Sequence, residues 1–545
     1  MTAISAHIER WERWWTAPAG IAPLVTLRVV IGAMLAFSTA RFMALGWVDD
    51  HYIRPVFHFA YAGFEWVRPL PPAGLYAVHI LLLLSSLAVL LGYRYRLAAV
   101  LQFLLFTYTE LLDLTYYLNH YYFVSIASAL LIVVPAHRAF SLDVWRRPEW
   151  ALEQVPRWTI AIFQLQLGIV YCYAGIWKIH ADWLIHALPL RIWLPANDQL
   201  PLIGPFLAMK YTPWLFSWAG MLYDATIVGW LLWARTRPVA YLTVILFHAI
   251  TGLLFQIGVF PLVMMGATLV FFSEKWHARW QDWFRRRVSP NTRHGSARSE
   301  IFLFKNFKGY TFFQKTALLY QTEKKTSERS NVGTDHQSTC DLPTFDLSEV
   351  VNRIHSLCST NMRPLRGHFE RVTQDFSVTD KNVYLLKLKK TNLPRLCGEK
   401  FVRRFVLIAL FFHFSFQILF PWRFLLYPGD VFWTEQGYRF AWRVMLMEKA
   451  GTATFYVKDG RTGREGEVVN REFLNAHQEK QMAMQPDLIL QFARFLEKHY
   501  ADQGVHEPVV RAEVYVTLNA RPSRLLFDPA LDLTQVRSTR ELFEP

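Results

Sequence analysis

Cysteine is scarce in this chain of 545 residues, and its four cysteines do not make a disulfide framework. Cys172 lies inside a long apolar run, whereas Cys340, Cys358 and Cys397 share one polar interval. The spacing of these three residues is not that of metal ligands. We therefore expect neither a disulfide-stabilised fold nor a metal site.

Acidic residues are too few to balance the basic ones: 43 Asp and Glu stand against 58 Lys and Arg, which gives a net charge of +15. The basic residues lie mainly between hydrophobic blocks, where their retention on the cytoplasmic side explains them. No nucleic-acid partner is therefore expected.

The signatures of several enzyme classes are also missing. The sequence contains no Walker loop, no HExxH, no GxSxG and no convincing GxGxxG. Any cofactor is thus expected to be a lipid-soluble molecule that enters from the bilayer. A cleavable signal is not expected either, because the first 15 residues are charged and aromatic and the first apolar run is long enough to remain as an anchor.

Hydrophobic residues make up 53% of the chain and aromatic residues 16%, with 21 Trp. They occur in blocks, which is typical of a polytopic helical membrane protein with polar parts appended. Nine blocks are long enough to span a bilayer or nearly so: 21–46, 73–93, 97–117, 119–135, 158–178, 213–234, 238–257, 258–273 and 402–422.

Arginines alternate along the connections between these blocks. They precede the first block, fill the second, fourth and sixth connections, and follow the eighth block. Positive residues are held on the cytoplasmic face, so the amino terminus is expected to be cytoplasmic and the carboxyl-terminal domain periplasmic or luminal. Asn119, His120 and Lys178 then all lie at the same non-cytoplasmic face.

Four parts are expected along the chain: a catalytic membrane bundle over 1–288, a largely disordered cytoplasmic linker over 289–400, a last transmembrane helix over 401–422, and an extracytoplasmic β-rich domain over 423–545. The linker is rich in Ser, Thr, Lys and Asn and has no sustained period. In the last part, FYVKDGRTGREGEVV and VVRAEVYVTLNARPSRLLFDP each predict strand, turn and strand, with a helix between them. The domain is therefore expected to be α+β or a small β-sandwich.

Ionisable residues inside a bilayer cost several kcal/mol unless they have partners, so each is a functional candidate. They are Glu110, Asp113, His120, Lys178, Asp224 and His248. Each also has a structural explanation, because an Asp or His between helices is often a packing hydrogen bond and a Lys at a helix end often extends to the interface.

Three uses of such residues remain open from the residues themselves. A proton-coupled transporter would collect carboxylates and a histidine, but no convincing internal repeat is present. A scaffold would need none of them. A membrane enzyme would need a base in a dry pocket, and burial lowers the pKa of a lysine so that a fraction is free amine.

Several segments resemble the vitamin K-dependent gamma-carboxylase family and its bacterial relatives, which have an HTTM-type membrane domain. They are LDLTYYLNHYYFVSIASALLIVVPAHRAFSLD, IVYCYAGIWKIHADWL with PLRIWL, LFHAITGLLFQIGVFP, LLYPGDVFWTEQGYRFAWRVML, FYVKDGRTGREGE and VYVTLNARPSRLLFDPALDL. They cover nearly the whole chain in order, except about 289–400. The combination of AG-x-x-K-x-x-ADW with DGRTG is the specific part of the likeness.

This resemblance implies a carbon-carbon lyase that oxygenates reduced vitamin K with O2 and uses the base so generated to carboxylate a glutamate-containing protein or peptide with CO2. It implies that Lys178 is the base toward the hydroquinone, supported by His120 beside Asn119. The quinone site is expected at His248, Asp224 and Trp183. Glutamate recognition is expected at Trp433, Tyr438 and Trp442.

Two alternatives to this function stay open. The first is a quinol epoxidase that does not carboxylate protein. The second is a non-enzymatic quinone-binding or transport protein. An apolar bundle that excludes water suits both the carboxylase hypothesis and the epoxidase alternative. In either reaction the strong base formed from the quinol would be quenched by water.

Overall fold

The structure is a computed structural model that describes residues 10, 13–255, 257–288 and 397–543. The linker expected over 289–400 therefore lies almost entirely outside the described residues and stays a prediction. The described residues up to 288 and from 403 onward belong to one compact unit.

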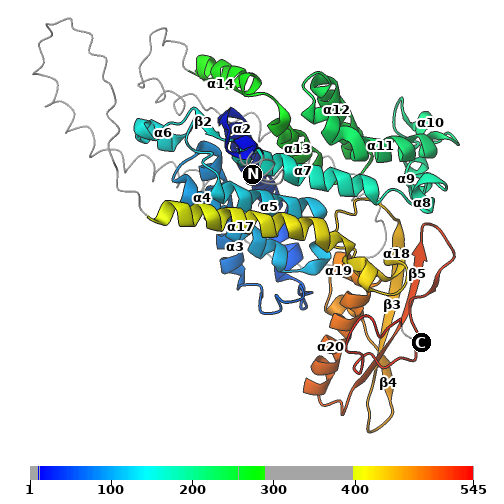
Figure 1. The fold of residues 1–545 in the computed structure, drawn as a ribbon. Helices are drawn as coiled ribbons and strands as arrows, with labels where there is room; N and C mark the ends of the chain where they lie inside the picture. Colours follow the sequence, from blue (N-terminus) through cyan, green and yellow to red (C-terminus); the bar gives the residue numbers. More distant parts are fainter. Residues whose placement is uncertain (1–9, 11–12, 256, 289–396, 544–545) are drawn as a thin grey trace, which may run out of the picture. The chain divides into compact units, whose positions relative to one another are not determined.

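Six helical segments are long and apolar enough to cross a membrane (Figure 1). They are α2 (Ala22–Ala44), α3 (Pro72–Leu91), α7 (Trp158–Ile176), α11 (Thr212–Leu232), α12 (Arg237–Leu254) and Val406–Leu426, which joins α17 (Cys397–Leu419) to the 3-10 helix η7 (Phe420–Leu426). The first turns of α2, α3, α11 and α12 contain proline, whose missing N–H costs nothing there. The chain is an integral membrane protein.

The expected count of nine spans is not confirmed. The other three expected blocks are helical but shorter: α4 (Tyr95–Leu111) has 17 residues, α5 (Asn119–Val133) has 15, and α13 (Phe260–Ala267) continues as the 3-10 helix η5 (Thr268–Phe271). A straight crossing of the hydrocarbon core needs about 20 helical residues. Apolar composition alone therefore overestimated the lengths of these helices.

The carboxyl-terminal part contains a four-stranded antiparallel sheet in the order β4-β3-β5-β6. Its strands are β3 (Lys449–Lys458), β4 (Glu465–Glu467), β5 (Val509–Leu518) and β6 (Arg524–Leu525). The central pair, β3 and β5, is in register from Lys449 opposite Leu518 to Lys458 opposite Val509. The expected strand, turn and strand patterns are thus confirmed.

The helix expected between these strands is α20 (Pro486–Asp502), which packs on β3 and β5 (Figure 1). The shorter α19 (Ala476–Met482) precedes it and packs on β3. This part of the described chain is therefore α+β, with one sheet in place of the two of a sandwich.

Residues from two connections of the bundle complete the core of this α+β region. Phe59, Tyr61 and Leu114 are buried in the same hydrophobic cluster as Phe455 and Phe492. Backbone contacts accompany this packing, since the N–H of Ala60 donates to Gln491 Oε1 at 2.9 Å. Residues of the bundle connections and of the sheet region thus share one hydrophobic core, and this core holds the two parts together.

Candidate active site

Lys178 lies two residues after the end of α7 and is buried, with 5% of its surface exposed. Its Nζ lies 2.7 Å from Oδ2 of Asp224 on α11, and it also donates to the carbonyl of Ala174 at 3.1 Å. Asp224 is likewise 5% exposed. The lysine therefore does not extend to the interface, which was the structural alternative, but forms an ion pair between two helices.

A glycine in the AG-x-x-K pattern explains how this pair forms. A Cβ on Gly175 would lie 2.6 Å from the backbone nitrogen of Ala225, so only glycine allows α7 and α11 to come this close. Ala225 is the neighbour of Asp224 and Gly175 lies one turn before Lys178. The close approach of the two backbones thus places the carboxylate at the ammonium.

Trp183, in α8 (Ala181–Leu184), also faces the lysine. The centroid of its ring lies 5.2 Å from Lys178 Nζ, within the range of a cation–π interaction. Its indole N–H donates to the carbonyl of Ser217 on α11 at 2.9 Å. The structure thus brings Asp224 and Trp183, two residues expected at the quinone site, to Lys178 itself.

His120 and His248 both contact one aromatic ring, that of Phe260. The ring of Phe260 is 5.2 Å from the imidazole of His120 on α5 and 5.7 Å from that of His248 on α12. Tyr171 of α7 and Nε2 of His248 are hydrogen-bonded at 3.1 Å, while the buried Nδ1 of His248 has no partner among the described residues. Two histidines that are distant in sequence therefore belong to one local arrangement.

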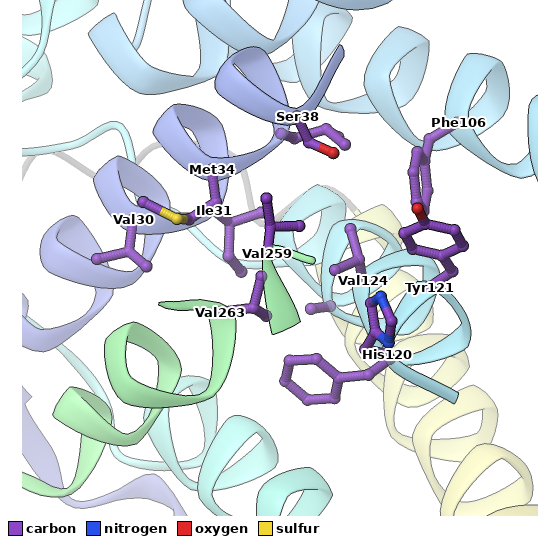
Figure 2. Close-up of a pocket in the computed structure, with 13 residues that line it drawn as sticks. Val30, Ile31, Met34, Ser38, Phe106, His120, Tyr121, Val124, Val259 and Val263 are labelled. Atoms are coloured by element: carbon purple, nitrogen blue, oxygen red, sulfur yellow. The ribbon is translucent and has the colours of Figure 1, made fainter. Parts of the chain in front are cut away.

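His120 lines a small apolar cavity with a volume of about 20 Å³. Figure 2 shows its imidazole next to Val124 and Tyr121, with Val259 and Val263 across the cavity and Val30 and Met34 of α2 further along. This volume holds about one water molecule. The side chains around His120 must therefore move apart before a larger molecule can bind beside it.

Asn119 contacts the carboxyl-terminal part of the chain. Its Nδ2 donates to the carbonyl of Arg443 at 2.9 Å, and its Oδ1 accepts from the hydroxyl of Tyr117 at 3.0 Å. The indole of Trp177 donates to the carbonyl of Ala441 at 2.6 Å. Asn119 and the residue before Lys178 thus hold the same short segment, 441–443, at the end of α7.

Trp442 is completely buried and stacks on Tyr122 of α5, with 4.9 Å between ring centroids. Burial raises the pKa of the Tyr438 phenol, so its hydroxyl stays protonated at neutral pH. Trp433 is partly buried, and its carbonyl accepts from Lys449 Nζ at 2.7 Å. Of the three residues expected to recognise glutamate, Trp442 therefore has no surface to offer a substrate and supports the segment from within.

The segment that carries these aromatic residues has an unusual backbone. Glu435, Phe440, Trp442 and Met445 have φ values of 55°, 57°, 57° and 52°, in the left-handed region that residues with a side chain seldom adopt. Each such residue costs on the order of 1 kcal/mol or more and persists only where the surroundings hold it. The hydrogen bonds from Asn119 and Trp177 are two of the contacts that do so.

Other residues of this region were not expected from the sequence. The guanidinium of Arg443 lies 3.9 Å from the ring centroid of Trp177 and is buried, and Phe260 and Tyr171 link the two histidines. Their signals were weak, because each is an ordinary residue of an aromatic-rich segment until the fold brings it to its partner. Asp113, by contrast, has a structural role: it accepts from Thr115 N at 2.9 Å and from Gln478 Nε2 at 2.6 Å.

Asp182 of the ADW sequence binds the sheet region. Its Oδ2 accepts from Arg521 Nη1 and from Asn519 Nδ2, each at 2.8 Å. The hydrogen bond from Arg521 holds the pKa of Asp182 below its ordinary 3.8, although burial partly opposes this. A lowered folded-state pKa means that the contact stabilises the fold above pH 3.8 and is lost as the pH falls through the folded-state value.

We expect Arg521→Gln to lower the free energy of unfolding by about 0.2–1 kcal/mol at pH 7, as for other exposed ion pairs. The difference should shrink as the pH falls through the lowered folded-state pKa of Asp182, because protonation removes the charge that Arg521 binds. Thermal unfolding in detergent over an acidic pH series measures this. A difference that stays the same at every pH would assign the effect of Arg521 to packing.

Two family models match the chain. The model of the HTTM domain matches residues 16–276, and the model described as the vitamin K-dependent gamma-carboxylase, lumenal domain, matches residues 402–542. No solved structure matches the chain.

Proposed function

Because the chain belongs to the vitamin K-dependent gamma-carboxylase family, we propose that it oxygenates reduced vitamin K and carboxylates glutamate side chains, as a carbon-carbon lyase. The observation that carries this proposal is the buried ion pair of Lys178 and Asp224, with 2.7 Å between Nζ and Oδ2. A buried ion pair is seldom the most stable solution for two helices, since apolar side chains of similar volume often pack as well or better. Its presence favours a chemical role over a purely structural one.

Lys178 and Asp224 are placed to act together on a proton. Asp224 accepts a hydrogen bond from the Lys178 ammonium, and transfer of that proton across the bond would leave a free amine. The amine would then take the proton of a bound hydroxyl while Asp224 keeps the transferred proton, and the ammonium that forms would pair with the oxyanion left on the substrate. The pair therefore makes a base that works without a buried unpaired charge at any step.

A buried nitrogen of His248, left unpaired by the described residues, supports placing the head of a reduced quinone in this region. The buried Nδ1 of His248 lacks a partner in the described chain and would serve a hydroxyl group. When bound, reduced vitamin K supplies the hydroxyl proton and, with O2, the strong base that deprotonates the γ-carbon of glutamate for addition of CO2. Tyr171, which bonds His248, lies two turns before Lys178, about 10 Å along the helix axis.

The placement of segment 433–442 supports its assignment to glutamate recognition. Asn119 and Trp177 hold residues 441–443 next to Lys178, so a side chain bound by Trp433 or Tyr438 would reach the same end of α7. The matching model is described as a lumenal domain, which supports an extracytoplasmic position for this part and a cytoplasmic amino terminus. The charge alternation of the connections supports the same orientation.

Incubation of membranes containing the protein with reduced vitamin K, labelled bicarbonate and a glutamate peptide tests the proposal. We expect O2-dependent epoxide and acid-stable label in the peptide, measured separately. Epoxide without fixed label would favour a quinol epoxidase. Formation of neither product, with a protein that is folded by thermal unfolding, would contradict the proposed function.

A further inference from the structure

A second and much larger cavity lies on the other face of α5. It has a volume of about 820 Å³, enough for a sizeable ligand. The residues of α5 that line it include Tyr122, Ser125 and Ala129, whereas His120, Val124 and Ala127 line the small cavity. Helix α5 therefore separates two cavities, and the larger one does not contain Lys178, His120 or His248.

The cavity wall is largely apolar and comes in large part from α4, α5 and α17. On α17 it includes His413, Phe416, Gln417 and Phe420, the spacing of one helix face. The small side chains of Ser125 and Ala129 on α5 leave the space that these larger residues face. Such a wall accommodates hydrocarbon chains.

One end of the cavity carries a positive charge without a counter-ion. Arg423 donates to the carbonyls of Phe420 and Arg439, and it forms no ion pair with a described residue. Its guanidinium lies 4.0 Å from the ring centroid of Phe420, which orients it. The next arginine at this end, Arg439, is already paired with Asp487 at 2.5 Å.

We propose that this cavity binds an anionic glycerophospholipid, with the phosphate at Arg423 and an acyl chain between α5 and α17. A guanidinium binds phosphate through two parallel donors, and a basic pocket between transmembrane helices suits an anionic lipid head group. Ser125 and Gln417, which also line the cavity, carry neutral donors that would bind the glycerol esters. This site is additional to the proposed quinone and glutamate sites.

The test uses the full-length protein, stripped of lipid in detergent and titrated with phosphatidylglycerol, with bound lipid counted by native mass spectrometry. We expect Arg423→Gln to weaken phosphatidylglycerol binding at least about tenfold, the loss of one charge-assisted hydrogen bond. Ala129→Trp, which fills the apolar part, should prevent binding. Arg471→Gln, a charge change at an exposed arginine outside the cavity, is the matched control and should bind as the parent does.

Glycerol phosphate, which lacks acyl chains, should not compete, because the apolar wall supplies much of the affinity. Competition by glycerol phosphate would overturn the lipid assignment in favour of a free-phosphate site. Unchanged binding in Arg423→Gln would overturn the proposal even if Ala129→Trp failed to fold. Equal binding of phosphatidylcholine, or displacement of phosphatidylglycerol by reduced vitamin K, would also overturn it, the latter by making this cavity the quinone site.

Discussion

Lys178→Ala is expected to lower O2-dependent epoxidation of reduced vitamin K by at least about 100-fold, the usual contribution of a general base. The amine that would take the hydroxyl proton is gone. Asp224 cannot replace it, because its carboxylate ends 2.7 Å from the position that Nζ occupied. Carboxylation should fall with epoxidation, because the base for the second step depends on the first. Epoxide formation per folded protein, measured in membranes, is the relevant quantity.

A loss of folding must be separated from a loss of chemistry. Removal of one partner of a buried ion pair leaves a buried unpaired charge and costs roughly 3–5 kcal/mol, so Lys178→Ala is also expected to be less stable. The double variant Lys178→Met with Asp224→Leu removes both charges and should recover most of that stability without recovering epoxidation. Epoxidation at the parental rate in either variant would remove Lys178 from the mechanism.

Trp442→Ala is expected to change the ratio of the two products. The side chain is fully buried against Tyr122, and its loss should cost about 3–5 kcal/mol and release the strained segment around it. Carboxylation should then fall at least about tenfold more than epoxidation, equivalent to ~1.4 kcal/mol of glutamate binding. Both products must be measured at a temperature below the unfolding transition of the variant.

Trp442→Phe is the control for this variant, since it keeps an aromatic ring on Tyr122 and should retain most of the carboxylation. An equal loss of both products in Trp442→Ala, at a temperature where it is folded, would limit Trp442 to a role in folding. Recovery in Trp442→Phe would show that stacking on Tyr122 is what the segment needs.

Local patterns in the sequence were sufficient for much of the fold. Continuous apolar runs predicted the six segments that qualify as spans, and alternation around DGRTG predicted the strands of the sheet. The limits appeared where helix ends depend on packing, as in α4 and α5, which are shorter than their apolar blocks. Hydropathy indicates which residues favour an apolar environment, but it does not determine the residue at which a helix ends.

The candidate site shows the same division. Lys178 could be singled out because a charge at the end of an apolar run is rare, but its pairing with Asp224 depends on the contact of α7 with α11 at Gly175. The bond of Asn119 to the carbonyl of Arg443 spans 324 positions of sequence. Spacing carries no information about such a partner, so residues could be predicted while their contacts could not.

The core shared by the sheet region and the bundle has a consequence for synthesis. Phe59, Tyr61 and Leu114 leave the ribosome long before Phe455 and Phe492, with which they pack. The sheet region therefore completes its core last, against connections that have already been made, and an excised fragment of residues 423–545 would expose the apolar surface that those connections cover. Insertion of the bundle and folding of the sheet region are therefore coupled, and faulty insertion of the first helices would leave residues 423–545 prone to aggregation.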